Sequence, residues 1–188
     1  LGDISCTSFF PAKPLGCFGD GGAVFTNNEE LAIKMKSLRL HGQSKRYYHK
    51  FIGMGGRMDT LQCAIVNVKL KHYKNDLALR QEVADKYTKA LHDKNLILPF
   101  VDEKCTSAWA QYSVRVKNRD EVQVRLKEQG IPTAVHYPMP LHLQEAFEYL
   151  GYKVGDFPVS EVVSEEIMSL PMNSYVSDEE MQKITEKL

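Results

Sequence analysis

This chain has no excess of either sign of charge, because its 188 residues contain 24 Lys and Arg and 24 Asp and Glu. Such a balance gives no long-range field that would recruit nucleic acid or an anionic membrane, although it is compatible with a local basic patch. Apolar runs of membrane-spanning length are also absent. We therefore expect neither nucleic acid nor a membrane among the partners of this protein.

Cysteine is scarce and scattered, with four residues and no C-x-x-C pair. A disulfide-stabilised scaffold would be denser in cysteine, so reduced thiols in a cytoplasmic protein are the better interpretation. The chain begins Leu-Gly-Asp, with neither an initiator Met nor a signal-peptide pattern. This start indicates either that a tag was removed or that the sequence begins inside a larger protein.

A hydrophobic fraction of 43% is ordinary for a globular core, and the length suits one domain or one and a half. Asn27 with Glu30, and Asp59 with Gln62, have the spacing of helix capping boxes. The elements predicted before residue 94 are a short buried strand in 3–10, a strand and helix ending at Gly42, an extended loop over 41–57 and a long helix over 59–93. Those predicted after it are strands in 108–118 and 131–137 and helices in 119–130, near 144–150 and from Ser177 onward.

Lys13 lies between Pro11 and Pro14, after the first predicted strand and before a glycine-rich turn. The two prolines prevent regular ladder pairing, so the lysine lies in a constrained loop. An unprotonated amine held in this way can attack the carbonyl carbon of a cofactor, and the hydroxyl of nearby Ser8 could donate to a phosphate. A merely solvated loop lysine is the competing interpretation.

Two glycine-rich segments raise the question of anion binding. The G-D-G-G run at 19–22 lacks the spacing of known nucleotide-binding loops and is better explained as a hairpin turn. In G-M-G-G-R at 53–57, three glycines let backbone N–H groups approach an anion, and Arg57 supplies a planar fork for phosphate or carboxylate. An equal alternative is a flexible loop that places Arg57 near a helix N-terminus.

The segment V-H-Y-P-M-P-L-H places His136 and Tyr137 at the end of a predicted strand and His142 after two prolines. Together with His41 and His49, these histidines suggest zinc, but H-E-x-x-H or paired-cysteine spacing is missing. A histidine and a tyrosine at a strand end in a rigid loop more often contact a polar ligand or cap the edge of a core.

The segment S-F-F-P-A-K-P-L-G-C-F-G-D-G-G at 8–22 resembles the active-site lysine segment of the DegT-type sugar aminotransferases. G-M-G-G-R-M-D-T-L-Q-C-A-I, H-Y-P-M-P-L-H-L-Q, G-D-F-P-V-S-E and S-L-P-M-N follow in the family's order. The resemblance implies an α/β fragment of the pyridoxal 5′-phosphate (PLP)-dependent aspartate-aminotransferase fold, fold type I. Its parts would be the end of the large PLP-binding domain over 1–58, a long interdomain helix over 59–93 and the small α+β C-terminal domain over 94–188.

The same resemblance implies roles for five residues. Lys13 would bond covalently to PLP and move protons as general acid and base, and Ser8 would bind the PLP phosphate. Arg57 would lie in a loop that reaches the neighbouring subunit's active site, which implies a homodimer with shared sites. His136 and Tyr137 would bind the sugar.

The G-G-R-M-D-T-L-Q version of the interface segment resembles the branch that aminates C3 of UDP-2-acetamido-3-keto sugars, particularly the glucuronate. It implies transfer of an amino group from a donor such as glutamate to a keto nucleotide-sugar, in the biosynthesis of lipopolysaccharide or another surface polysaccharide. Members with His in place of the lysine are dehydratases, so Lys13 argues against that chemistry.

The chain departs from the family's pattern in three places. Many members have Asn at the position of Gly55, and often have His at that of Asn173. Family members also carry about as much chain again before the lysine segment, including the Asp that pairs with the pyridine nitrogen. We therefore expect this chain to be the C-terminal half of such an enzyme and to bind PLP weakly and turn over little by itself.

Two other classes of function are open at this point. One is a non-catalytic module on the same scaffold that binds a nucleotide-sugar or supports dimerisation. The other is a metal-dependent hydrolase built on the histidines. Uptake of PLP separates the enzyme from the module, and metal analysis of the purified protein tests the hydrolase.

Overall fold

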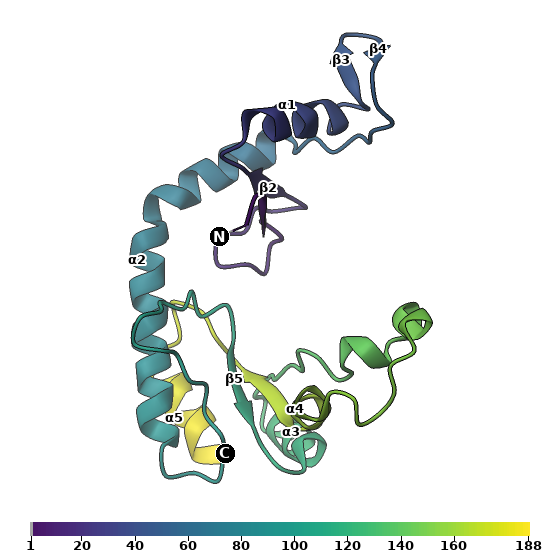
Figure 1. Cartoon of the computed structure of the whole chain (residues 1–188). Coiled ribbons are helices and arrows are strands. Elements are labelled where there is room, and N and C mark those ends of the chain that lie inside the picture. The colour runs from purple at the N-terminus through teal and green to yellow at the C-terminus, as the bar shows by residue number, and fades with distance from the viewer. Residues whose placement is uncertain (1) are drawn as a thin grey trace. The chain divides into compact units, whose positions relative to one another are not determined.

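The computed structural model describes residues 2–188, which form two compact units (Figure 1). Unit 1 is Leu1–Lys74 and unit 2 is Asn75–Leu188. The boundary falls inside α2 (Thr60–Leu91), a single helix of 32 residues where the sequence predicts one over 59–93. Within the described residues, no helix is both long and apolar enough to cross a membrane.

Unit 1 begins with an antiparallel ribbon of two strands, β1 (Ser5–Ser8) and β2 (Gly22–Phe25). The sequence predicts a buried strand in this place, and that prediction is wrong on burial. All four residues of β1 are exposed, and Val24 and Phe25 of β2 are more than half exposed. A sheet face becomes buried only when another layer covers it, and no element in the described part of unit 1 does so.

After β2 the chain forms α1 (Glu29–Leu38) and a small hairpin of β3 (Gln43–Lys45) and β4 (Tyr48–His49). The N-cap of α1 is Asn28, whose side chain accepts from Leu31 N, so the cap predicted at Asn27 is one residue off. The hairpin replaces the extended loop predicted over 41–57. Strands of two or three residues are too short to show an alternating pattern.

Gly42 follows α1 and turns the chain away from it, as the sequence predicts. Its φ of +75° lies in the left-handed region, and its N–H donates to Ser37 O at 2.8 Å. A Cβ at this position would lie 1.7 Å from Phe51 O, so a side chain does not fit.

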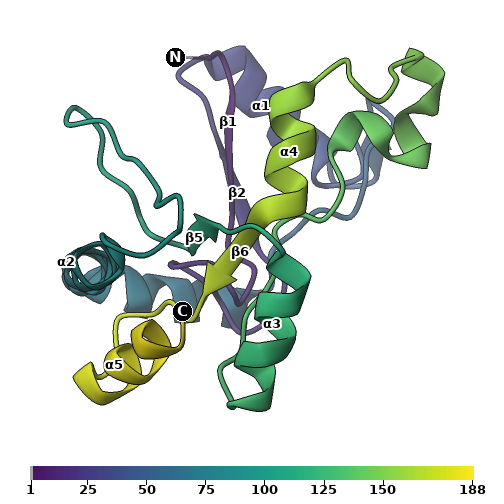
Figure 2. The same ribbon diagram turned by 90° about the horizontal axis from the view of Figure 1, so that it is seen from below.

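Unit 2 is an α+β unit built around the antiparallel pair β5 (Tyr112–Arg115) and β6 (Ile167–Leu170). Its helices besides the second part of α2 are α3 (Arg119–Glu128), α4 (Pro158–Glu166) and α5 (Asp178–Lys187). Figure 2 shows α4 running directly into β6. Two 3-10 turns, Leu141–Leu143 and Glu145–Leu150, precede α4.

Unit 2 differs from the prediction in three respects. Only Tyr112–Arg115 of the strand predicted over 108–118 pairs, because its partner β6 has four residues. The strand predicted over 131–137 is reduced to a single bridge between Ala134 and Ser169. The sequence also misses α4, which begins at Pro158 and has an ordinary helix start with proline in its first turn.

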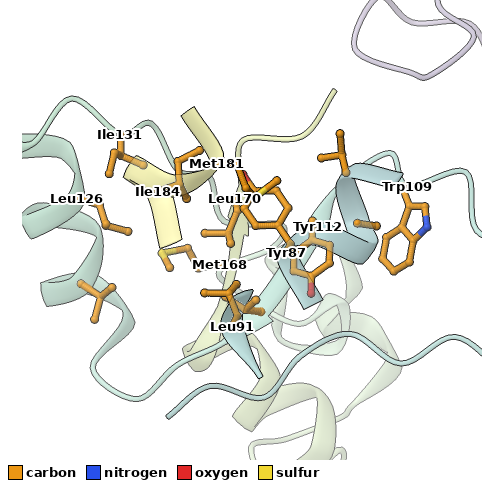
Figure 3. Close-up of a cluster of buried hydrophobic side chains, with 14 residues drawn as sticks. Tyr87, Leu91, Trp109, Tyr112, Leu126, Ile131, Met168, Leu170, Met181 and Ile184 are labelled. Atoms are coloured by element: carbon orange, nitrogen blue, oxygen red, sulfur yellow. The ribbon is translucent and has the colours of Figure 1, made fainter. Parts of the chain in front are cut away.

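The hydrophobic core lies in unit 2, where 14 buried side chains from α2, α3, α5, the two strands and the loops pack together (Figure 3). Tyr112 stacks between Tyr87 and Trp109, with ring centroids 4.9 Å and 5.6 Å away. The hydroxyl of Tyr87 donates to Pro171 O at 2.7 Å, and burial raises the pKa of this tyrosine. The buried residues of β5 and β6 hold the sheet on this core, and the sheet in turn positions the residues around His136.

Candidate active-site residues

Lys13 lies in a short loop that closes on Phe9. Phe9 N donates to Gly21 O, and Cys17 N donates to Phe9 O, both at 2.8 Å. The Cys17 thiol, which is 1% exposed, also donates to Phe9 O, at 2.9 Å. Lys13 N donates to Phe10 O at 2.8 Å, so the backbone at the lysine belongs to the same closed turn. The Lys13 side chain is exposed, and its amine is therefore accessible to a reacting carbonyl.

Helix α2 fixes the other end of this loop through Gln62 and Lys69, which lie two turns apart on one helix face. Gln62 Oε1 accepts from Phe18 N at 2.8 Å. Lys69 Nζ donates to Gly16 O at 2.6 Å and lies 4.9 Å from the centroid of the Phe18 ring. The Gln62 amide thus holds the lysine loop, whereas the sequence predicts that Gln62 is the capping-box partner of Asp59.

Gly16 allows the lysine loop to fold closely on itself, and Gly22, the first residue of β2, allows close approach to β1. A Cβ on Gly16 would lie 2.7 Å from both Phe10 O and Pro11 O, and a Cβ on Gly22 would lie 2.8 Å from Thr7 O. Backbone oxygens cannot move aside as the end of a long side chain can. Glycine is therefore required at both positions for this loop geometry.

Ser8 is the last residue of β1 and precedes the lysine loop directly. Its Oγ accepts from Phe10 N at 3.1 Å. The Ser8 hydroxyl hydrogen makes no hydrogen bond within residues 2–188, so it is available to an acceptor such as a phosphate oxygen. The structure thus brings exposed Ser8 and Lys13 onto one strand-and-loop segment, as the sequence predicts.

Arg57 lies in the segment between the β3–β4 hairpin and α2, and its side chain is exposed. It makes no ion pair with the described residues. Gly55 bridges to Leu40, and Gly56 N donates to Arg39 O at 3.0 Å, which anchors the backbone before Arg57 to the end of α1. A planar guanidinium that is anchored but has no internal partner suits a carboxylate or phosphate ligand.

Gly55 faces the imidazole of His41. A Cβ built on Gly55 would lie 3.1 Å from His41 Cε1 and 3.4 Å from His41 Nε2. His41 has a left-handed backbone, with φ of 60°, and its carbonyl oxygen lies 2.8 Å from His49 Nδ1. An asparagine at position 55 would press on this ring, so in this chain an imidazole stands beside the glycine.

His136 lines a pocket of about 230 Å³ in unit 2, together with Thr133, Ser169 and Met172. Its Nδ1 lies 3.0 Å from Ser169 Oγ. Tyr137 is 70% exposed, and its ring meets that of His136 edge-on at a centroid distance of 5.6 Å. The imidazole of His136 thus lines a shallow pocket, and the exposed phenol of Tyr137 stands next to that ring.

His142 and Glu161 fasten the connection ahead of α4. The Glu161 carboxylate accepts from Gly155 N at 2.9 Å and Phe157 N at 3.2 Å, and lies 3.0 Å from His142 Nε2. The backbone hydrogen bond from Gly155 is the largest cause that lowers the pKa of Glu161, and burial opposes it. The His142 ring packs on Phe157 with centroids 4.7 Å apart, so this histidine has a structural role in the connection.

The structure divides the five residues predicted for the site between the two units. Ser8, Lys13 and Arg57 belong to unit 1, and His136 and Tyr137 to unit 2. Among residues 2–188, no group of three or more His, Cys, Asp or Glu side chains is arranged to hold a metal ion. The sequence interpretation missed the residues that hold the two clusters: Cys17, Gln62, Lys69 and Ser169.

Comparison with solved structures defines the class of fold. The chain matches a DegT DnrJ EryC1 StrS aminotransferase from Brucella abortus with a TM-score of 0.93 and 41% sequence identity, over 100% of this chain and 50% of that one. It matches NtdA from Bacillus subtilis, solved with bound cofactor PMP, with a TM-score of 0.87 and 28% identity, over 99% of this chain and 45% of that one. The fold is therefore part of that of the PLP-dependent aminotransferases.

The model of the DegT/DnrJ/EryC1/StrS aminotransferase family matches residues 1–188, and the chain belongs to this family. A relative from Pseudomonas aeruginosa, named UDP-2-acetamido-2-deoxy-3-oxo-D-glucuronate aminotransferase, is 46% identical over 176 residues. That match covers 94% of this chain and 48% of the relative. The chain thus spans about half the length of the relatives it matches.

The residues of unit 1 fit the cofactor of this family, which is PLP. PLP carries an aldehyde and a phosphate, and unit 1 offers a primary amine at Lys13 and a hydroxyl hydrogen at Ser8 on one exposed segment. Gly16 and Gly22 keep the backbone of that segment close together, where any side chain would force it apart. Lys13 and Ser8 are therefore the candidates in unit 1 for holding the cofactor.

Proposed function

We propose that the whole protein carrying this chain is a PLP-dependent transaminase that acts on a keto nucleotide-sugar. The proposed acceptor is a UDP-linked 2-acetamido-3-keto sugar, and the proposed donor is an amino acid such as glutamate. The printed name of the P. aeruginosa relative, which specifies a 3-oxo-glucuronate, supports this acceptor. We further propose a cytoplasmic setting in surface polysaccharide biosynthesis.

The observation that carries the proposal is the placement of the Lys13 amine. It is exposed on a loop whose backbone is closed by Phe9 and Cys17 and tied to α2 by Gln62 and Lys69. A lysine needed only for solubility requires no such framework. A lysine that bonds to a cofactor and then moves protons requires such a framework. Both tasks depend on a backbone that is held in place at the base of the flexible side chain.

Bound PLP supplies an aldehyde and an electron-withdrawing ring that takes up negative charge from the substrate carbon. Nζ of Lys13 binds the cofactor and, as general base and acid, holds the proton that moves at the carbon where the amino group is exchanged. The Ser8 hydroxyl donates to the phosphate. Glycine at positions 16 and 22 allows the two residues to share one short segment.

For the nucleotide-sugar, we propose that Arg57 binds a carboxylate or phosphate and that His136 and Tyr137 bind sugar hydroxyls or the sugar carboxylate. The role of Arg57 is supported by its lack of an ion partner within residues 2–188, and that of His136 by the pocket that it lines. The role of Tyr137 is supported by its exposure next to the His136 ring. We also propose a homodimer in which Arg57 serves the active site of the neighbouring subunit.

The domain assignment belongs to the same proposal. We assign residues 1–58 to the end of the large PLP-binding domain, 59–93 to the interdomain helix and 94–188 to the small α+β domain. The continuity of α2 across the two compact units supports the role of the helix. The 14-residue core of unit 2 supports an independently packed small domain.

The proposal is tested by Lys13→Ala in the full-length protein that carries this sequence, with Lys36→Ala, an exposed lysine of α1, as the control. We expect Lys13→Ala to lose the visible absorbance of the covalently held cofactor and at least about 10²-fold in transamination rate. Borohydride treatment of the unchanged protein should fix the cofactor to a peptide that contains Lys13, as read by mass spectrometry.

Two results would contradict the proposal. Cofactor fixed by borohydride to a lysine other than Lys13 would remove the assigned role of this residue. Binding of a UDP-sugar by the full-length protein without any uptake of PLP would indicate a non-catalytic binding module instead. A panel of 3-keto and 4-keto UDP-sugars then tests the proposed acceptor, for which we expect amination at C3.

A further inference from the structure

A pair of serine hydroxyls, those of Ser113 and Ser169, lies next to His136, and no role has been assigned to Ser113. Ser113 of β5 and Ser169 of β6 face each other across the sheet, and their Oγ atoms are 2.9 Å apart. Ser169 Oγ also lies 3.0 Å from His136 Nδ1. Ser169 is 4% exposed, and its hydroxyl contacts both of these groups.

The backbone of Ser169 is fully engaged as well. Its N–H donates to Ala134 O at 2.8 Å, and its carbonyl oxygen accepts from Ala134 N at 3.2 Å. These bonds fasten the segment just before His136 to the edge of β6. The backbone of Ser169 is therefore held on both sides, by Ser113 of β5 and by Ala134, and its Oγ lies within hydrogen-bonding distance of Ser113 Oγ and His136 Nδ1.

The hydroxyl hydrogens of both serines can rotate, so the pair accommodates both neutral tautomers of His136 in two arrangements. In the first, Ser113 donates to Ser169, and Ser169 donates to an unprotonated His136 Nδ1. In the second, His136 Nδ1–H donates to Ser169, and Ser169 donates to Ser113. Ser169 is satisfied in both, because it always donates once and accepts once. Either neutral tautomer of the imidazole is thus held at the same ring nitrogen.

The other ring nitrogen is the one left for a ligand. His136 Nε2 makes no hydrogen bond within residues 2–188, and His136 lines the pocket described above. In the first arrangement Nε2 carries a hydrogen and donates, as a carboxylate or carbonyl ligand requires. In the second arrangement it accepts, as a sugar hydroxyl requires.

We propose that Ser169, supported by Ser113, is a positioning residue that holds the imidazole of His136 through Nδ1 and so directs Nε2 to the sugar substrate. This inference rests on the proposed function for the identity of the ligand. The geometry of the three side chains does not depend on it, so the two can be tested separately. The chemical class of ligand is a hydroxylated sugar, with or without a carboxylate.

The experiment compares Ser169→Ala, Ser113→Ala and Ser169→Thr, which restores the hydroxyl, in the full-length protein with its cofactor. The control is Ser164→Ala, which removes an equally buried serine whose hydroxyl donates to Glu161 O. The first measurement is the ¹⁵N spectrum of the His136 ring, assigned with His136→Gln. We expect Ser169→Ala to shift the Nδ1 and Nε2 resonances, and Ser164→Ala to leave them unchanged.

The second measurement is steady-state kinetics with the keto sugar. We expect Ser169→Ala to raise KM for the sugar about tenfold, equivalent to ~1.4 kcal/mol, with kcat changed less than about twofold. Ser113→Ala, which leaves Ser169 in place, should give a smaller rise of the same kind. Ser169→Thr should restore most of the loss.

The outcomes separate the inference from the proposed function. An unchanged His136 spectrum in both Ser169→Ala and Ser113→Ala overturns the inference, whatever the activity. If Ser169→Ala shifts the His136 spectrum but leaves KM for the sugar unchanged, Ser169 holds the ring but not for binding this sugar. That result also overturns the inference. Failure of the proposed function would instead be seen in the unsubstituted protein, as absence of transamination.

Discussion

The shape of the loop that carries Lys13 depends on the absence of a side chain at Gly16. The oxygens of Phe10 and Pro11 lie only 2.7 Å from where a Cβ on Gly16 would stand, and the Gly16 oxygen accepts a hydrogen bond from Lys69. Gly16 therefore cannot gain a methyl group without displacing backbone atoms on either side of the lysine. The proposed role of Lys13 therefore depends on a residue that has no reactive group of its own.

Gly16→Ala is expected to displace the lysine loop and reduce PLP binding by the full-length protein by about tenfold or more, since overpacking of this kind costs about 1–3 kcal/mol. Cofactor titration followed by absorbance measures the effect. Gly2→Ala is the control, because a Cβ there would meet only Ile4 O, at 3.7 Å. Equal cofactor affinity in the two variants would show that the loop tolerates the methyl group.

The sequence predicts that this loop is constrained, but it does not predict which residues hold it. Two prolines beside Lys13 correctly indicate a constrained segment ahead of a turn. The groups that hold the loop are Cys17, Gln62 and Lys69, and two of these lie more than forty residues away in sequence. No local pattern encodes such contacts, although the seven-residue spacing of Gln62 and Lys69 marks a shared helix face.

At the scale of helices and strands, the sequence predicts the start of a capped helix better than it predicts the length of a strand. Ser177 caps α5 with a reciprocal capping box to Glu180, and the helix begins where the sequence predicts. The predicted strand over 131–137 instead reduces to the one bridge between Ala134 and Ser169. Local caps are encoded by neighbouring residues, whereas the length of a strand depends on a distant partner.

The local stability of the connection before α4 should depend on pH through the ionisation of Glu161. Its carboxyl pKa is lowered from the ordinary value of 4.5, so its stabilising effect is complete above that value and is lost as the pH falls through the lower, folded pKa. We expect the protection factors of the Gly155 and Phe157 amides to fall in that acid range. Hydrogen exchange with mass spectrometry measures them, with correction for the intrinsic pH dependence.

Glu161→Gln should show the same loss of protection at neutral pH, because an amide oxygen accepts more weakly than a carboxylate. Glu165→Gln, on the exposed side of α4, is the matched control and should behave like the unsubstituted chain. Protection that is unaffected by Glu161→Gln would mean that packing of His142 on Phe157 alone holds the connection.

At the scale of the whole molecule, buried apolar surface is distributed very unequally. The 14-residue core belongs to unit 2, whereas the buried hydrophobic residues of unit 1 are Cys17 and Val66. The sequence predicts enough apolar residues for a core but not which unit contains it. The apolar side chains of the β1–β2 ribbon have the pattern of a buried strand and are exposed in the described structure.

Leu126→Ala is expected to destabilise unit 2 by about 2–5 kcal/mol, because it opens a cavity among fully buried side chains. Hydrogen exchange of this chain should then show faster exchange in β5, β6 and the second part of α2. The amides of β1 and β2 should be unaffected. Val124→Ala, at a position 58% exposed on the same helix, is the control. Parallel loss of protection in both units would show that they unfold as one cooperative body.

The open β1–β2 ribbon also bears on how this polypeptide behaves in the test tube. Two short strands with unpaired outer edges and outward-facing Val24 and Phe25 form a template on which further strands can add. Concentrated samples of this chain should therefore self-associate through the ribbon into β-rich aggregates. A charged residue in place of Val24 would then improve solubility and leave the packed interior of unit 2 intact.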